Sequence, residues 1–415
     1  MRSLEPQIFR LFLVMALLSA RLGGPGRAEA AEARYRVTLT TLSAGEEVFE
    51  RFGHTVLSIE DRSGPSAWVY SFGTFDSDAP HLWHKALHKR LRYWVVAMSP
   101  LLMTLRYDHR AGVVQELDLD AQQAGSLSAQ LAWIVRPENR EYPYDLFTDN
   151  CVTRLRDLLD AACGGALRRQ TAGPAPLTFR QAVMKTLAPV PLLAAAATLI
   201  YGPYTDKPRS RWESLFLPDA LRDALTELDI AEGGPPHPLL RKQWNWQGEY
   251  YSPPRRLPHP LWGPVVMGLL LLYGAACCAR GKWERGCQVL GGVGASLSLL
   301  MAALGLILCY LRTTPHLCFQ HNNNSLLISP LTGLAAPLFI LLSLGRHSSK
   351  QRRLLILAVT LPALLLVWHG AAGHLFGACG QMHGGVWLSA AAAHATLLVI
   401  AVFLRAGSPA SESPL

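Results

Sequence analysis

Five long apolar segments in the C-terminal part of the chain constrain its fold more than any other feature. They span residues 261–279, 289–311, 325–344, 354–372 and 386–404, and each is long enough to cross a bilayer as a helix. Lys and Arg residues gather between the first and second segments and between the third and fourth, so those loops should be cytoplasmic. The sequence therefore predicts an all-α transmembrane bundle of five helices over residues 259–415.

The first 30 residues have the features of an export signal. Arg2 and Arg10 precede a short apolar stretch, and Ala28-Glu29-Ala30 is suited to cleavage. The stretch is short for a membrane span, although a retained signal anchor stays an alternative. Both alternatives export the domain that follows, residues 31–258. We expect a multi-pass protein of the bacterial inner (cytoplasmic) membrane with this domain in the periplasm.

The net charge of +9 does not indicate a nucleic-acid partner, because Lys and Arg residues are spread along the chain and flank apolar runs. Anionic lipid is the expected partner, so we predict contact with a membrane and none with nucleic acid. His81, His84 and His88 are spaced to share part of a helix face, but no carboxylate completes a metal site there. Basic and apolar residues interleave with these histidines, as in a segment that lies on lipid headgroups. We predict no metal and no cofactor.

The candidate nucleophile is Cys151, which follows Asp149-Asn150. Apolar residues recur at helical spacing after it, and Asp149 or Asn150 is suited to cap the helix, so Cys151 should lie in the first turn. Unpaired amides and the helix dipole favour a thiolate there, and the same amides can receive an oxyanion. A disulfide with Cys163 is disfavoured, because twelve helical residues would separate the two by about 18 Å.

The candidate base is His54, at a point where a helix should lead into a strand. A capping-box pattern at 43–46 predicts a short helix with a buried apolar side, and residues 55–60 then alternate as a strand does. A second strand at 68–72 should form a hairpin with the first, which places Tyr70 and Ser71 near His54. An exported domain with this histidine and Cys151 indicates cysteine–histidine acyl chemistry.

These motifs resemble the Lnb-type lipoprotein N-acyltransferases of bacteria. The resemblance rests on Phe52-Gly53-His54, residues 70–75, residues 144–154 and residues 212–218, with a weaker likeness at 314–327. More distantly, histidine before cysteine resembles the permuted papain-like superfamily, which includes NlpC-type peptidases. The implied fold is an α+β papain-like (permuted NlpC-type) domain with an antiparallel sheet packed on the cysteine helix. The implied activity moves an acyl chain from a phospholipid, through a thioester on Cys151, to the free amine of the N-terminal diacylglyceryl-cysteine of a lipoprotein.

The third catalytic group is left open by this resemblance. Family members commonly carry asparagine where this chain has Ser71, so Ser71 and Asp149 are both candidates. Five further residues are candidates for substrate binding, either beside the catalytic motifs or just before the third apolar segment: Gly53, Tyr70, Asn150, His321 and Asn324.

Two alternatives to the acyltransferase stay open. One is an NlpC-type cysteine peptidase or amidase acting on the cell wall, and the other is a non-catalytic membrane scaffold. Five spans favour the lipid substrate, because a cell-wall hydrolase needs only a simple anchor. Cys318 and Cys379 fall in the two loops expected in the periplasm, where they could pair as a disulfide.

Overall fold

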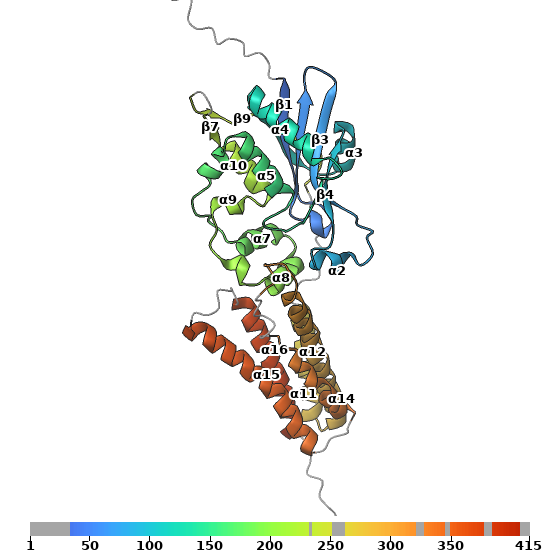
Figure 1. The fold of residues 1–415 in the computed structure, drawn as a ribbon. Helices are drawn as coiled ribbons and strands as arrows, with labels where there is room; N and C mark the ends of the chain where they lie inside the picture. Colours follow the sequence, from blue (N-terminus) through green and yellow to red (C-terminus); the bar gives the residue numbers. More distant parts are fainter. Residues whose placement is uncertain are drawn as a thin grey trace, which may run out of the picture.

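The computed structural model describes residues 34–231, 235–250, 262–320, 328–344, 349–376 and 384–406. An α+β part with an antiparallel sheet comes first in the chain, and a helical part follows it, drawn below the sheet in Figure 1. The expected signal segment, residues 1–30, lies outside the described residues, so its cleavage or retention stays a prediction.

The sheet has seven strands in the order β6-β4-β3-β2-β1-β5-β9, and every neighbouring pair is antiparallel. Its strands are β1 (Tyr35–Leu42), β2 (His54–Asp61), β3 (Ser66–Phe75), β4 (Tyr93–Met98), β5 (Gly112–Leu117), β6 (Glu141–Tyr142) and β9 (Leu240–Trp246). A separate pair joins β7 (Asp229–Ile230) to β8 (His237–Pro238). The predicted hairpin is confirmed as β2 and β3, with Val56 opposite Ser71 and Leu57 opposite Tyr70.

Alternate side chains of the central strands enter two different cores. Leu39 and Leu57 face helices α4 (Ala121–Ile134) and α5 (Cys151–Ala162), which pack together on one side of the sheet. Val56 and Val69 face helix α3 (Pro100–Tyr107) on the other side. Each fully buried Leu or Val stabilises this arrangement by about 1.5–3 kcal/mol. The strand β2, which begins with His54, is therefore held on both faces.

A third core lies at the end of the α+β part nearest the helical part (Figure 1). Phe147, Phe179 and Phe216 form its centre, with ring centroids 4.6–5.2 Å apart. The elements that follow α5 are α6 (Ala166–Gln170), α7 (Phe179–Leu187), α8 (Pro191–Ile200), η2 (Pro203–Asp206), α9 (Arg211–Ser214) and α10 (Pro218–Thr226). The Arg180 guanidinium ties α7 to η2 through a buried ion pair with Asp206, at 2.7 Å. This core carries the loop that leads into Cys151.

The helical part contains α11 (Trp262–Ala279), α12 (Trp283–Arg312), η3 (Pro330–Ala335), α14 (Ala336–Ser343), α15 (Ser349–Phe376) and α16 (Gly384–Ala406). Each predicted apolar segment thus contains helix. Among the described residues, however, α12 alone is both long and apolar enough to cross a membrane. The structure therefore supports one spanning helix, and the five-helix membrane bundle stays a prediction.

The segment before His54 differs from the predicted helix. Only a single 3-10 turn forms, η1 (Val48–Glu50), and no side chain caps it. Val48 and Phe49 are 52% and 53% exposed, so the expected burial of this turn is wrong. The reason is local, because the Gly45 N–H donates to the Glu50 carbonyl and closes a loop too short for a helix.

Candidate active site

Cys151 opens helix α5, and Asn150 is its N-cap as predicted. The Asn150 Oδ1 atom accepts hydrogen bonds from the N–H groups of Val152 and Thr153, at 2.8 and 2.9 Å. The Thr153 hydroxyl in turn accepts from the Asn150 N–H, at 2.8 Å. The Asn150 Nδ2 group donates to two backbone carbonyls, at 2.7 and 3.0 Å. Because these bonds occupy its amide, the structure does not support direct substrate binding by Asn150 and gives it the role of fixing Cys151.

The Cys151 side chain lies against the strands that carry the candidate base. The backbone N–H of Thr55, the residue after His54, donates a hydrogen bond to the sulfur. On another side, a Cβ atom added to Gly73 would lie 3.7 Å from the Cys151 Cβ. Within the described part of the chain, no hydrogen bond joins the imidazole directly to the half-buried sulfur. The sulfur therefore lies against the backbone of β2, at the residue that follows His54.

The Ser71 side chain is hydrogen-bonded to His54, the candidate base. Its Oγ atom lies 2.9 Å from His54 Nε2, and the Tyr107 hydroxyl lies 3.5 Å from the same Oγ. Ser71 is 2% exposed, and the Tyr107 ring centroid is 5.7 Å from that of His54. A buried hydroxyl on a central strand therefore fixes one nitrogen of the imidazole and leaves Nδ1 to face other groups.

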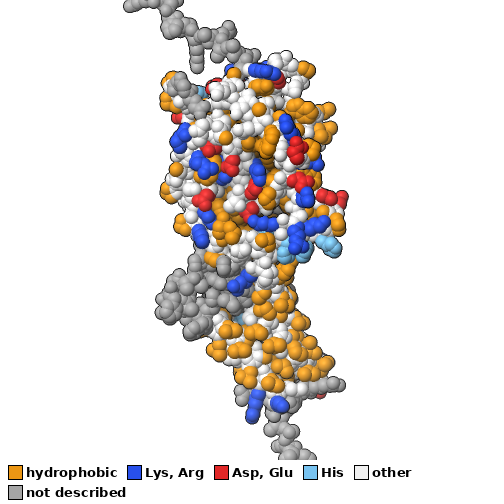
Figure 2. Space-filling view, in the orientation of Figure 1, with side chains coloured by type: hydrophobic (Ala, Val, Ile, Leu, Met, Phe, Trp, Pro, Cys, Tyr) orange, Lys and Arg blue, Asp and Glu red, His pale blue; other side chains and the backbone are white. Residues whose placement is uncertain are grey.

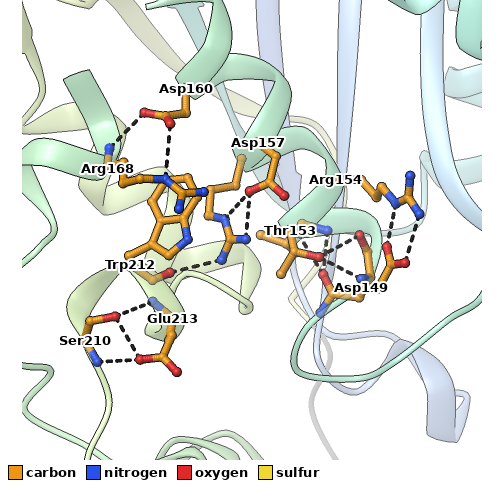
Figure 3. A network of polar contacts seen from close by, with 12 residues as sticks. Asp149, Thr153, Arg154, Asp157, Asp160, Arg168, Ser210, Trp212 and Glu213 are labelled. Atoms are coloured by element: carbon orange, nitrogen blue, oxygen red, sulfur yellow. Dashed lines mark hydrogen bonds and ion pairs between the residues drawn. The ribbon is translucent and has the colours of Figure 1, made fainter. Parts of the chain in front are cut away.

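Asp149, the other candidate for the third group, is used elsewhere. Its carboxylate forms a two-pronged ion pair with the Arg154 guanidinium, with Oδ2 and Nη2 2.9 Å apart (Figure 3). Arg154 also lies over the ring of Tyr142, 4.5 Å from the centroid. The structure shows no contact between Asp149 and His54 among the described residues, so the geometry favours Ser71.

Gly53 has a conformational role that directs His54 onto its strand. Its φ is +81°, and an added Cβ would lie 2.8 Å from the Leu42 carbonyl oxygen. Leu42 is the residue opposite His54 in the β1–β2 ladder. Tyr70, by contrast, is 6% exposed within the main core, and this burial does not support its prediction as a substrate contact. His321 and Asn324 lie outside the described residues, so their predicted roles are untested.

The pKa values of Cys151 and His54 differ from those expected for a stabilised thiolate. The amides of Thr55, Val152 and Cys151 itself do favour the thiolate, but burial outweighs them and raises the pKa of Cys151 to about 11. Burial and the positive charges of Arg110 and Arg106 lower the pKa of His54 to about 3. The resting site at neutral pH therefore holds a neutral thiol and a neutral imidazole.

Sequence reasoning missed Tyr142, on the short strand β6. Its hydroxyl is buried and donates no hydrogen bond to the described residues. The hydroxyl would lie 3.8 Å from a Cβ added to Gly73, which is the glycine that borders Cys151. Burial raises the pKa of Tyr142, and the negative charge that Cys151 carries when it is a thiolate raises it further. The hydroxyl therefore stays protonated and close enough to the sulfur to respond to its charge. Nothing in the sequence distinguishes it from the neighbouring tyrosines, because only the β4–β6 pairing brings it to the site.

The structure describes no group of three or more His, Cys, Asp or Glu side chains in its resolved ranges that could hold a metal ion. The His84 and His88 ring centroids lie 4.5 Å apart beside helix α2 (Leu82–Leu87). His88 Nε2 lies 2.9 Å from the hydroxyl of Tyr310 on α12. His88 therefore contributes to the contact between the two parts of the molecule.

Comparison with known protein families matches residues 28–185 to the Lnb N-terminal periplasmic domain. The matched range includes His54, Ser71 and Cys151. No curated protein and no solved structure was found to match the chain. With the apolar helix α12, the match indicates a membrane-associated protein that carries a periplasmic domain.

Proposed function

Because residues 28–185 belong to the Lnb N-terminal periplasmic domain family, we propose that the chain is a lipoprotein N-acyltransferase. It would move an acyl chain from a phospholipid, through a thioester on Cys151, to the α-amine of the N-terminal diacylglyceryl-cysteine of a lipoprotein. One observation carries the proposal: the Cys151 sulfur accepts the N–H of the residue after His54, whose imidazole is itself held by Ser71.

The acylation half of the proposed reaction would use His54 as the base. With Nε2–H donating to Ser71 Oγ, the lone pair of His54 Nδ1 is free to accept the Cys151 proton. The sulfur attacks the ester carbonyl of the phospholipid as that proton moves, because a neutral thiol needs a base in the same step. The imidazolium then returns the proton to the departing oxygen, the C–O bond breaks and a lysophospholipid leaves.

The second half transfers the acyl chain to nitrogen. The lipoprotein amine attacks the thioester carbonyl, and His54 Nδ1 accepts a proton from the attacking nitrogen. The C–S bond breaks, the sulfur takes the proton back from the imidazolium and an amide is released. Each tetrahedral intermediate carries a negative oxygen, and the Tyr142 hydroxyl lies beside Cys151 with a proton free to donate. We assign Tyr142 to that stabilising role.

The surface of the helical part supports a membrane location. Large apolar side chains are exposed along it, including Leu272, Leu306, Leu357 and Val399, and Figure 2 shows a nearly continuous apolar surface below the charged α+β part. A water-soluble protein seldom exposes so large a patch. We propose that all five apolar segments span the inner membrane, with the catalytic domain in the periplasm. Placement at the lipid surface would keep water scarce, so that the amine outcompetes hydrolysis of the thioester.

The proposal is tested by expressing the gene in a bacterium that lacks its own lipoprotein N-acyltransferase. Mass spectrometry of lipoprotein N-terminal peptides should show an added acyl chain with the wild-type protein. Cys151→Ser and His54→Ala should leave the free amine, whereas Cys163→Ala, at the far end of the same helix, should still acylate. A free amine on every peptide with the wild-type protein would refute the proposal.

The same strains separate the two alternatives. Loss of stem-peptide bonds from isolated cell wall, dependent on Cys151 and without lipoprotein acylation, would identify a peptidase or amidase. Full cellular function of Cys151→Ser and His54→Ala proteins would identify a non-catalytic scaffold.

A further inference from the structure

The segment after α12 returns from the helical part and becomes part of the periplasmic core. Cys318 is 5% exposed and packs in the same cluster as Phe147 and Tyr201. Its carbonyl accepts the Gly202 N–H at 2.6 Å, and the Phe319 ring stacks on Tyr201 with centroids 6.1 Å apart. Cys379, the predicted disulfide partner of Cys318, lies outside the described residues, so that pairing stays a prediction.

His316, within this segment, faces a carboxylate of the catalytic domain. Its Nε2 lies 2.8 Å from the Ala86 carbonyl oxygen, which can only accept, so Nε2 carries a hydrogen. The other ring nitrogen, Nδ1, lies 3.9 Å from Asp145 Oδ2. The Lys89 ammonium lies 3.2 Å from the same oxygen. One oxygen of Asp145 thus pairs with Lys89 of the catalytic domain and lies opposite His316 of the helical part.

The other oxygen of Asp145 organises the loop before the nucleophile. Oδ1 accepts the N–H groups of Phe147 and Thr148 at 3.1 and 3.2 Å, and the Thr148 hydroxyl at 3.0 Å. The backbones of Asp145 and Asp149 exchange two hydrogen bonds, at 2.9 and 3.1 Å, which close the loop. Burial raises the pKa of Asp145, but the nearby His316 ring, the loop hydrogen bonds and the Lys89 charge outweigh it and hold the pKa well below its usual range. The closed loop leads directly into the Asn150 cap and Cys151.

We propose that His316 is a positioning residue for the reaction: by holding Asp145, it fixes the 145–149 loop and so the placement of the Cys151 sulfur. The helical part would then complete the active site as well as anchor it. The catalytic consequence rests on the proposed function, but the link between His316 and the loop does not. A small displacement of a reacting atom lowers a rate by about a hundredfold, so a histidine remote from the substrate can matter greatly.

The link is tested first without any acyl-transfer assay, by hydrogen–deuterium exchange of the full-length protein in phospholipid nanodiscs. In His316→Gln, the side-chain amide can still donate to the Ala86 carbonyl and keep the segment docked, but it places no ring nitrogen opposite Asp145 Oδ2. Amides of the 145–149 loop should exchange about five- to tenfold faster in this variant, the equivalent of roughly one hydrogen bond. The matched control is Tyr310→Phe, which removes the hydrogen bond between His88 and α12 and leaves Asp145 untouched.

The catalytic consequence is tested by single-turnover formation of the Cys151 thioester from a phospholipid in the same nanodiscs. His316→Gln should lower the maximal rate at least about tenfold and leave the half-saturating donor concentration unchanged, since His316 would act only on the sulfur's placement. Asp145→Asn combined with His316→Gln should be no slower than Asp145→Asn alone, because both changes act through one contact.

The outcomes separate the two proposals. Wild-type exchange and wild-type rates in His316→Gln would show that the histidine only docks the segment, and would overturn the inference. Faster loop exchange in a protein whose wild type forms no thioester would uphold the link and refute the acyltransferase instead. If His316→Gln loses its fold, Asp145→Asn supplies the second variant, and unchanged loop exchange there also overturns the inference.

Discussion

The protonation state of Cys151 gives the sharpest test of the resting site. Burial raises its pKa to about 11, compared with 9.0 for an ordinary cysteine. Two pKa units correspond to about a hundredfold less thiolate at pH 7, because each unit is a factor of ten. Alkylating reagents attack the thiolate, so Cys151 in the folded protein should react about a hundredfold more slowly than an unstructured cysteine.

The assay is timed alkylation with iodoacetamide across pH 6–11, followed by mass spectrometry of the peptide that contains Cys151. The rate should rise about tenfold per pH unit up to at least pH 10, without an earlier plateau. His54→Ala should change this resting rate less than about threefold, because an imidazole with a pKa near 3 carries no charge that could stabilise a thiolate at neutral pH. The peptide from urea-unfolded protein supplies the reference rate.

A plateau between pH 6 and 8, or a large drop in rate in His54→Ala, would refute this reasoning. Either result would mean that a thiolate–imidazolium pair already exists before substrate binds. The amides at the start of α5 would then dominate over burial, as the sequence alone had suggested.

Three further substitutions test the site and the turn that builds it. Ser71→Ala should lower kcat about fivefold with little change in KM in a steady-state acyl-transfer assay, since one neutral hydrogen bond to the base contributes about 1 kcal/mol. Tyr142→Phe keeps the ring under Arg154 but removes the hydroxyl. Thioester formation should slow about a hundredfold, while alkylation of Cys151 keeps its wild-type rate. Equal rates of thioester formation in the variant and the wild type would show that Tyr142 has no part in the mechanism. Gly53→Ala should lower the free energy of unfolding by at least about 1–2 kcal/mol, because its φ of +81° is unfavourable for alanine, and an unchanged denaturation midpoint would contradict this.

The elements that sequence predicted best are those set by local rules. Alternation over residues 35–39 and 55–60 gave the strands, and the Asn150 cap placed Cys151 at the start of a helix. Such patterns depend only on near neighbours in the chain. The same local reasoning failed before His54, where a capping-box pattern occupies a loop too short to continue as a helix.

The properties that sequence could not give depend on distant segments. Ser71, and not Asp149, contacts His54 because of the register of β2 against β3 and because Arg154 pairs with Asp149. The raised pKa of Cys151 follows from its burial in the folded protein, which the spacing of apolar residues along the chain does not predict. Tyr142 comes to the site on a two-residue strand, too short for any pattern to reveal.

The return of Cys318 into the domain's core changes how the two parts of the molecule can move. The chain passes from the α+β part to the helical part after β9. A domain attached by that single connection could rotate about it. The segment just after α12, which packs into the core around Phe147, makes a second attachment and restricts that rotation. In the acyltransferase proposed above, Cys151 would consequently keep a constant height and direction relative to the membrane, and a long-chain donor would meet it in one orientation.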